Sequence, residues 1–391
     1  MKTCAQLLIV LAALACTAAV GAGAVRAAEP DLNLIARQAV EVLDLQPGEN
    51  VVIHTWRHTL EFAEMLAREV YRAGALPLIV MDSDSLYAFR LAEVPEETLR
   101  LTSKLALGLV RNLDAEIVLA GPGDPAVFAA GSPAKLAAIS EADRPLTELW
   151  KERQARGMYI NHGFATPQRA AQYGVDYEQW RDSVLAAIGA DLDAVSEQAE
   201  RLRVLLEDAE EVVVTTPQGT DLVFSTQGRE ARFWKAAITP EMVAEGEGWA
   251  MLPSGSVACT IVETSADGTV VAPQVALWGK VVRNLLWQFE SGRLVRYSAD
   301  VNLEPFAEYL EGASGDKDRI ASITIGVNPE GEPTGLGLED WMYSGVVSIG
   351  IGRNLDDGGE NDTDFGWSVS LTGTTVVIDG TVAVQDGEIV I

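Results

Sequence analysis

Cysteine and histidine, the residue types that most often build metal and redox sites, are scarce in this chain of 391 residues, which has three of each. Cys4 and Cys16 fall within the first thirty residues, so one thiol, Cys259, remains beyond them. A single thiol excludes an intramolecular disulfide. Because no histidine lies near Cys259 in the sequence, we expect a small buried hydrophobic residue there rather than a nucleophile.

Positive charge is scarce as well. Lys and Arg number 29 against 57 Asp and Glu, which gives a formal net charge of −28. This balance argues against nucleic acid and anionic membranes as partners. The acidic residues are dispersed along the chain, which is typical of a solvated surface.

Long apolar runs are confined to the start of the chain. Lys2 precedes the apolar run Leu7–Val20, and small residues follow it. This pattern predicts a secretory signal peptide over residues 1–27 and export to the periplasm or the extracellular space. A lipoprotein anchored through Cys16 is the alternative. No later run reaches the roughly 18 apolar residues of a membrane span, so we expect no transmembrane segment.

The pattern of predicted secondary structure changes twice along the chain. Between residues 31 and 174, helical stretches alternate with short β-rich runs at 50–53, 76–80, 116–119 and 158–161. Such alternation predicts a Rossmann-like α/β domain with a parallel sheet over residues 28–175. Helical spacing of apolar residues then predicts a connecting segment over 176–208. Hairpin patterns predict a second, mostly β, α+β domain over 209–391.

Phosphate-binding fingerprints are missing. Gly121-Pro-Gly-Asp124 follows a predicted strand, but it matches neither the dinucleotide nor the nucleoside-triphosphate loop pattern.

The three histidines all lie near the ends of predicted strands: His54 and His58 after the first, and His162 after a later one. Ligands of open α/β sheets collect at the carboxyl ends of the strands. If the three imidazoles converge there, they could hold one divalent transition metal with an open coordination position. Nearby carboxylates that could join them are Glu61, Asp82 and Asp84. The alternative is that each histidine caps or hydrogen-bonds locally.

A succession of loops in the second half carries a resemblance to a known family. The segments are Thr216-Pro-Gln-Gly-Thr-Asp-Leu-Val-Phe224, Leu252-Pro-Ser-Gly-Ser-Val257, Ser265-Ala-Asp-Gly268, Ile325-Gly-Val-Asn-Pro329, Ser344–Gly352 and Gly358–Ser368. The sequence resembles the aminopeptidase T family of thermophilic-type metallo-aminopeptidases. The resemblance implies the α/β-then-β fold, two zinc or cobalt ions held by two Glu, two His and an Asp in the second domain, an assisting Tyr, and a homodimer.

The residues at those family positions differ in this chain. The five metal-ligand positions carry Ser256, Ser322, Ser348, Gly366 and Ser368, and the Tyr position carries Leu355. Serine hydroxyls and glycine offer divalent metals neither negative charge nor an imidazole. The resemblance therefore implies the fold, while the substitutions predict loss of the dinuclear site. Two functions stay open: a peptide or small-ligand binding protein, and a metal-dependent hydrolase with its site moved to the histidines.

Aromatic residues near the altered positions could line a ligand cleft, and the candidates are Trp249, Trp341 and Trp367. Packing in the β core is the competing interpretation. Acidic residues crowd the same region, and they could hold calcium through oxygen atoms alone or form a solvated loop. They are Glu339, Asp340, Asp356, Asp357, Glu360, Asp362 and Asp364.

Overall fold

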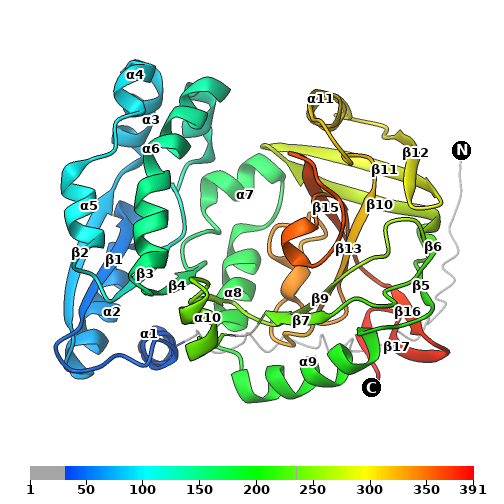
Figure 1. The fold of residues 1–391 in the computed structure, drawn as a ribbon, viewed down its shortest axis with the longest axis horizontal. Coiled ribbons are helices and arrows are strands. Elements are labelled where there is room, and N and C mark those ends of the chain that lie inside the picture. The colour runs from blue at the N-terminus through cyan, green and yellow to red at the C-terminus, as the bar shows by residue number, and fades with distance from the viewer. Residues whose placement is uncertain (1–30, 235) are drawn as a thin grey trace, which may run out of the picture.

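The computed structural model describes residues 31–391 except Lys235, and its N-terminal part is built on a parallel β-sheet (Figure 1). The predicted signal peptide and Cys16 lie outside the described residues. The strand order is β2-β1-β3-β4-β8, and every pairing is parallel. The strands are β1 (Asn50–Trp56), β2 (Leu76–Asp82), β3 (Ala115–Leu119), β4 (Arg156–Ile160) and β8 (Trp249–Leu252).

Helices cover both faces of this sheet. Val51 and Ile53 of β1 face a core that includes Phe62, whereas Val52 faces Trp150 on the other side. Both faces are buried because parallel strands are joined by crossover helices. The helices are α1 (Leu32–Val42), α2 (Leu60–Arg72), α3 (Asp84–Glu93), α4 (Glu96–Leu99), α5 (Lys104–Val110) and α6 (Pro133–Glu152), with 3₁₀ turns η1 (Arg57–Thr59) and η2 (Pro125–Ala130).

Strand β8 comes from beyond the predicted domain boundary at residue 209. It follows α10 (Pro240–Ala244) and pairs with β4, so the second half of the chain completes the first sheet. Ala250 and Leu252 are buried in the core of the first domain. The predicted boundary therefore does not separate two continuous domains. A short apolar strand carries no sequence signal for which sheet it joins.

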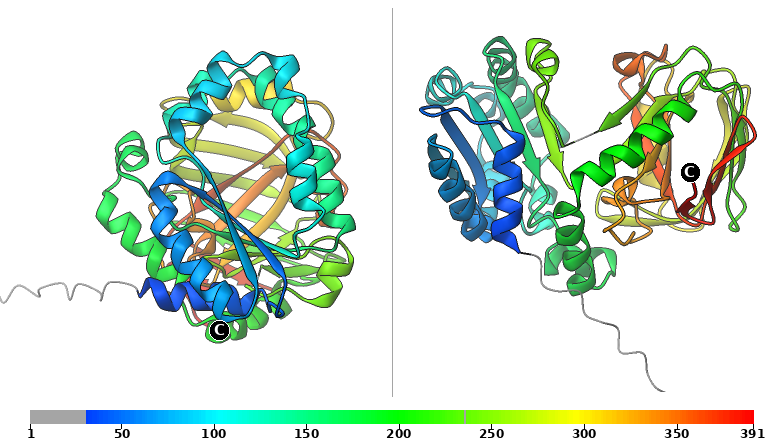
Figure 2. Two further views of the ribbon diagram at one scale, coloured as in Figure 1. Left: turned by 90° about the vertical axis from the view of Figure 1, so that its left-hand side faces the viewer. Right: turned by 90° about the horizontal axis from the view of Figure 1, so that it is seen from below.

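Three helices connect the two parts: α7 (Pro167–Tyr173), α8 (Tyr177–Ile188) and α9 (Leu192–Leu206). The side chains of Asp176 and Asp191 accept backbone N–H groups at the starts of α8 and α9, which is the usual reason for an aspartate there. The first core includes Trp180 of α8, and the second includes Leu202 of α9. Figure 2 shows α9 running from the parallel-sheet domain to the β domain.

The second domain consists of two antiparallel sheets around one core, with orders β12-β11-β10-β6-β5-β16-β17-β18 and β15-β14-β13-β9-β7. Its strands are β5 (Val212–Thr215), β6 (Asp221–Phe224), β7 (Ala231–Trp234), β9 (Ser256–Thr260), β10 (Asp267–Leu277), β11 (Lys280–Glu290), β12 (Arg293–Ser298), β13 (Ile320–Gly326), β14 (Val347–Gly352), β15 (Gly366–Leu371), β16 (Thr375–Ile378), β17 (Thr381–Gln385) and β18 (Glu388–Ile389). It also carries α11 (Glu304–Gly312) and the 3₁₀ turns η3 (Asp340–Met342) and η4 (Leu355–Asp357).

Over residues 31–391 apart from Lys235, no helix has both the length and the apolar character needed to cross a membrane.

Candidate functional site

The smaller antiparallel sheet has one apolar face and one face rich in hydroxyl groups. Strands β9, β13, β14 and β15 send alternate residues, such as Val257, Ile323, Ile349 and Val369, into the core. Because side chains alternate along a strand, the residues between them face the other way. We call this second surface the hydroxyl face; its members are Ser256, Thr260, Ser322, Thr324, Ser348, Ser368 and Ser370.

Strand register aligns these side chains in rows across the sheet. One row runs from Thr260 through Ser322 and Gly350 to Ser368. In the neighbouring row the hydroxyls of Ser348 and Ser370 are 2.8 Å apart. Gly350 leaves room for its neighbour, since a Cβ there would lie 2.5 Å from the Ser322 Oγ. Of the five residues that the resemblance aligns with family metal positions, four therefore lie on this face; the fifth, Gly366, is opposite Gly352 at the start of β15.

Two hydroxyls of this face are buried and lack a hydrogen-bond partner. Ser256 is fully buried, Thr260 is nearly so, and neither hydroxyl oxygen contacts another polar protein atom. A buried hydroxyl without a partner carries a desolvation cost of about 1–3 kcal/mol. Ser256 lines one cavity and Thr260 another, so a bound molecule could satisfy both.

The donor set on the hydroxyl face does not fit a divalent transition metal, because it consists of neutral hydroxyls. Within the described part of the chain, no group of three or more His, Cys, Asp or Glu side chains could hold a metal ion. Cys259, on the core side of β9, is buried, and burial raises the pKa of its thiol to about 12.

The acidic loop considered for calcium has its charges spread over separate partners. Arg353 contacts Asp356 at 2.8 Å and Asp362 at 3.2 Å, while Asp364 accepts the Ser314 backbone N–H at 2.8 Å. Asp340 accepts the backbone N–H groups of Thr334 and Gly337. The other members of the candidate set, Asp357, Glu360 and Glu339, contact Arg232, Arg229 and Trp180 respectively. The carboxylates therefore do not converge on one point.

An apolar cavity of about 280 Å³ opens beside Ser256. Its aromatic wall comprises Tyr159, Trp249 and Trp341. Trp249 is 38% exposed and stacks on Trp150, with ring centroids 5.0 Å apart. It lies close over Gly157, where a Cβ would come within 2.4 Å of the indole ring. Two of the three predicted cleft tryptophans thus line a cavity at the hydroxyl face.

The third predicted cleft tryptophan, Trp367, does not line this cavity. Trp367 packs against the aromatic cluster of the core, 5.0 Å from the Phe306 ring and 5.7 Å from Trp287, and it lines none of the cavities described here. The strand alternation that puts Ser368 on the hydroxyl face turns its neighbour Trp367 inward. Leu355, which the resemblance aligns with the family Tyr position, is 45% exposed on η4.

A larger cavity of about 520 Å³ lies between the two domains. His54 and Trp150 line it from the first domain, and Arg232 and Asp357 line it from the second. It shares Trp249 with the apolar cavity, and it shares Arg232 and Asp357 with a cavity of about 160 Å³ beside Thr260 and Ser322. We call these three adjoining cavities the interdomain groove.

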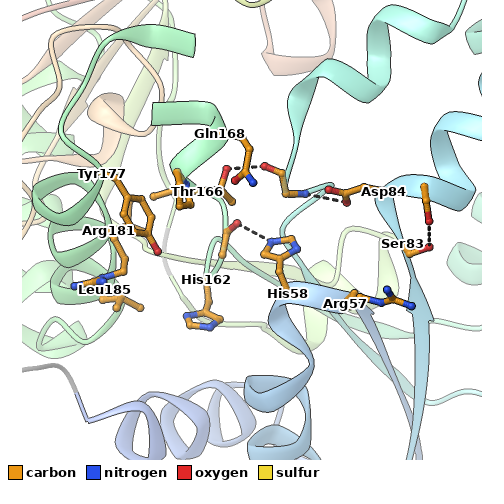
Figure 3. A pocket seen from close by; sticks show the side chains of 16 residues that line it. Arg57, His58, Ser83, Asp84, His162, Thr166, Gln168, Tyr177, Arg181 and Leu185 are labelled. Atoms are coloured by element: carbon orange, nitrogen blue, oxygen red, sulfur yellow. Dashed lines mark hydrogen bonds between the residues drawn. The ribbon is translucent and has the colours of Figure 1, made fainter. Parts of the chain in front are cut away.

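The three histidines do not converge, so the predicted three-histidine site is absent from the described structure. His54 points into the interdomain groove, and its Nε2 lies 3.2 Å from Glu116 Oε2. His58 and His162 instead line a crevice at the carboxyl end of the parallel sheet (Figure 3). The side chain of His54 leaves a strand interior, where alternation decides the face, whereas His58 and His162 lie beyond strand ends.

This crevice, of about 580 Å³, is lined by loops that follow β1, β2, β3 and β4 and by helix α8. His58 donates its Nε2–H to the carbonyl of Gly163 at 3.0 Å. His162 is largely buried against the Phe62 ring, and its Nδ1 has no partner. Burial, with a smaller contribution from His58, lowers the pKa of His162 to about 4. Of the three carboxylates proposed to accompany the histidines, Asp84 lines the crevice.

One buried acid was considered only as a calcium ligand, and no sequence motif marks its role. Glu339 is 1% exposed and accepts the indole N–H of Trp180 at 3.1 Å. Burial raises its pKa to about 8, with a further contribution from Asp340. Thr260 and Tyr159 also escaped prediction. A period-two run of Ser and Thr on β9 and β13 is the signal that could have indicated a hydroxyl-lined face.

A family model described as thermophilic metalloprotease (M29) matches residues 29–318. The fold is similar to that of wild-type AmpT from Thermus thermophilus, at 20% identity and a TM-score of 0.71, over 92% of this chain and 99% of that chain. It is also similar to 2,5-dihydroxypyridine dioxygenase from Pseudomonas putida KT2440, at 15% identity and a TM-score of 0.57, over 92% and 96% of the two chains. A search of curated proteins finds no match. At these identities the structural likeness shows the fold, and the two names differ in chemistry.

Proposed function

This chain belongs to the thermophilic metalloprotease (M29) family, and we propose that neutral residues occupy the five family metal positions and that the protein binds a peptide or another small ligand without metal-dependent hydrolysis. The observation that carries this proposal is the hydroxyl face, where register places Ser322, Ser348 and Ser368 on adjacent strands. The resemblance to the aminopeptidase T family, predicted from the loops, is confirmed by the family match.

The proposed loss of hydrolysis follows from charge. A dinuclear site activates a bridging water because two cations lower its pKa, and carboxylates and imidazoles hold those cations. Serine hydroxyls remain neutral and are weak ligands for zinc or cobalt. Beside Ser322 the groove is lined by Arg232, Asp357 and Glu230, and the first two are 3.8 Å apart and compensate one another.

The proposed ligand has an apolar group and a neutral polar group. Tyr159, Trp249 and Trp341 offer aromatic surface for the first, and the buried hydroxyl of Ser256 offers a hydrogen bond for the second. Such a combination, an apolar wall with a few fixed polar atoms, is typical of small-molecule sites. His54 and Arg232 border the adjoining part of the groove, where a longer peptide could extend.

Export and dimerisation are parts of the same proposal. Export rests on the residues before 28, and a signal-peptide deletion variant compared with the full chain by cell fractionation would test it. A homodimer rests on the family resemblance, and light scattering on the purified chain would test it.

Metal content tests the proposed loss of hydrolysis. The protein, expressed without a chelating tag and dialysed against a weak chelator, should hold far less than one equivalent of zinc or cobalt and should leave leucine anilide uncleaved. A variant carrying Ser256→Glu, Ser322→Glu, Ser348→His, Gly366→His and Ser368→Asp serves as the positive control, and it should gain metal. Stoichiometric metal in the natural chain, together with hydrolysis that chelator removes, would overturn the proposal.

Ligand binding needs its own test with a defined probe. Isothermal titration with the dipeptide Leu-Phe should show binding to the natural chain that Trp249→Ala weakens about tenfold, because the indole forms one wall of the apolar cavity. Trp278→Ala is the matched control, since Trp278 is 64% exposed and lies outside the groove. Equal affinity of both variants for Leu-Phe would show that the dipeptide does not bind against Trp249.

A further inference from the structure

We infer that the crevice at the carboxyl end of the parallel sheet binds a small primary amine with an apolar body. The crevice is a second site, separate from the interdomain groove, and His58, Asp84 and Gly123 line its polar side. It lies where strand order reverses, between β1 and β3, the position at which open α/β sheets bind ligands. Its volume of about 580 Å³ suits a small organic molecule.

The orientation of His58 makes it a hydrogen-bond acceptor toward the crevice. A carbonyl oxygen can only accept, so the contact between His58 Nε2 and Gly163 O places the proton on Nε2. In the neutral ring Nδ1 then keeps its lone pair. Within the described residues no protein atom donates to this Nδ1, so it is free to accept from a ligand.

Asp84 supplies the second acceptor, and its carboxylate is held in place. It accepts the backbone N–H groups of Gly123 at 3.1 Å and Asp124 at 2.9 Å. The loop that donates them is tied on its other side, where Thr166 donates to the Gly123 carbonyl at 2.6 Å and Arg169 to the Pro122 carbonyl at 3.0 Å. The carboxylate therefore cannot swing away without breaking its two backbone hydrogen bonds, and the contacts of Thr166 and Arg169 hold the donating loop in place.

These two acceptors face one point above Gly123. A Cβ built on Gly123 would lie 3.1 Å from His58 Nδ1 and 3.4 Å from Asp84 Oδ2. Both acceptors therefore lie on the side of Gly123 to which its Cα hydrogen points, and an ammonium group packed against this glycine in the crevice would face both of them. An ammonium group has three donors and no acceptor, so it matches two converging acceptors.

An anionic ligand fits this wall poorly. The glycine-loop N–H groups that could hold a phosphate are already used by Asp84. Two arginines line the crevice as well, but Arg181 contacts Asp182 at 2.6 Å and Glu178 at 2.7 Å, and Arg57 is exposed to solvent. The chain's net charge of −28 also favours cations in general.

The opposite wall of the crevice offers a surface for the apolar body of the ligand. Helix α8 presents Tyr177, Val184 and Leu185 to the crevice, and Ala165 lies beside them. Figure 3 shows Tyr177 and Leu185 across the cavity from His58 and Asp84. A molecule that places its amine near Gly123 can therefore rest its hydrocarbon part on α8.

Titration of the full chain with phenethylamine and with its matched acid, 3-phenylpropanoate, tests the inference. We expect one-to-one binding of the amine and at least tenfold weaker binding of the acid. Methylamine should bind more weakly than phenethylamine because it lacks the apolar body. Equal or tighter binding of the acid, or no binding of the amine, would overturn the inference.

Two glycine variants locate the amine. Gly123→Ala puts a methyl group at the point between the two acceptors and keeps the N–H groups that hold Asp84, so amine affinity should fall at least tenfold. Gly121→Ala is the matched control, because a Cβ there meets nothing within 4 Å. Asp84→Asn should also weaken the amine, whereas the exposed Asp386→Asn should not. Unchanged affinity in folded Gly123→Ala would contradict the assignment, and thermal unfolding monitors folding in each variant.

Discussion

The hydroxyl face of the interdomain groove and the crevice at the carboxyl end of the parallel sheet carry different kinds of polar group. The groove presents neutral hydroxyls on a rigid sheet, and the unpaired ones, Ser256 and Thr260, are buried. The crevice presents a tautomer-fixed imidazole and an anchored carboxylate on loops. On the hydroxyl face, strand register fixes the positions of neutral side chains. In the crevice, hydrogen bonds to backbone groups orient His58 and Asp84 and thereby make both of them acceptors.

Glu339 accepts a hydrogen bond from Trp180 on α8, the helix that lines the crevice, and replacement of Glu339 should have the largest effect on stability. Its pKa is about 8 in the fold against 4.5 for the ordinary group, so the folded state binds the extra proton between these values. Stability contributed by Glu339 is thus present below pH 4.5 and lost as the pH rises through 8. Glu339→Gln should raise the free energy of unfolding at pH 8 by up to about 4 kcal/mol, at 1.36 kcal/mol per pKa unit.

Urea unfolding at pH 5 and pH 8 measures this prediction. The difference between the Gln variant and the natural chain should be small at pH 5 and large at pH 8. A difference that does not change with pH would show that Glu339 is ionised in the fold.

Glycines of the two regions should respond differently to a methyl group. Gly163, beside the crevice, has a φ of +82°, and a Cβ there would lie 2.2 Å from Thr59 Cγ2. Gly366, near the hydroxyl face, has nothing within 4 Å. Gly163→Ala should cost about 2–3 kcal/mol from backbone strain and overpacking, and Gly366→Ala less than about 0.5 kcal/mol. Calorimetry measures the stability of both variants, and similar losses in the two would contradict the predicted difference.

Acid should destabilise the folded protein through His162, which lines the crevice. Its pKa falls from 6.5 to about 4 on folding, so the unfolded chain binds more protons in that window. The stability is present above pH 6.5 and is lost as the pH falls toward 4, by up to about 3 kcal/mol. His162→Gln should remove this dependence, whereas the control His54→Gln, in the groove, should keep it. Identical pH profiles for His162→Gln and the natural chain would refute the assignment.

The smallest effect is expected at the hydroxyl face. Ser256→Ala removes a buried hydroxyl that has no partner, so in the absence of ligand the free energy of unfolding should rise by up to about 1 kcal/mol. Binding of Leu-Phe should weaken in the same variant, because the hydroxyl is proposed to contact the ligand. The control is Ser348→Ala, which loses the contact with Ser370 and should destabilise the protein. Destabilisation by Ser256→Ala would indicate a partner within the protein.

Periodicity and motif were enough to predict the main architecture. Alternating apolar runs predicted the parallel sheet, and the loop series from Thr216 to Ser368 predicted the family, because both signals are local in the chain. The place of strand β8 in the parallel sheet was not predicted, because its four residues do not encode which sheet they join. The histidines were placed near the right sheet edge, yet His54 leaves the strand toward the other cavity.

Composition and local pattern thus determined the α/β class and the family. Tertiary structure alone decided which side chains meet. It turned Trp367 into the core, separated His54 from His58 and His162, and brought Asp84 and Gly123 together across 39 residues of sequence. The physical reason is that strand register and loop packing arise from contacts distant in sequence, and no single segment carries that information.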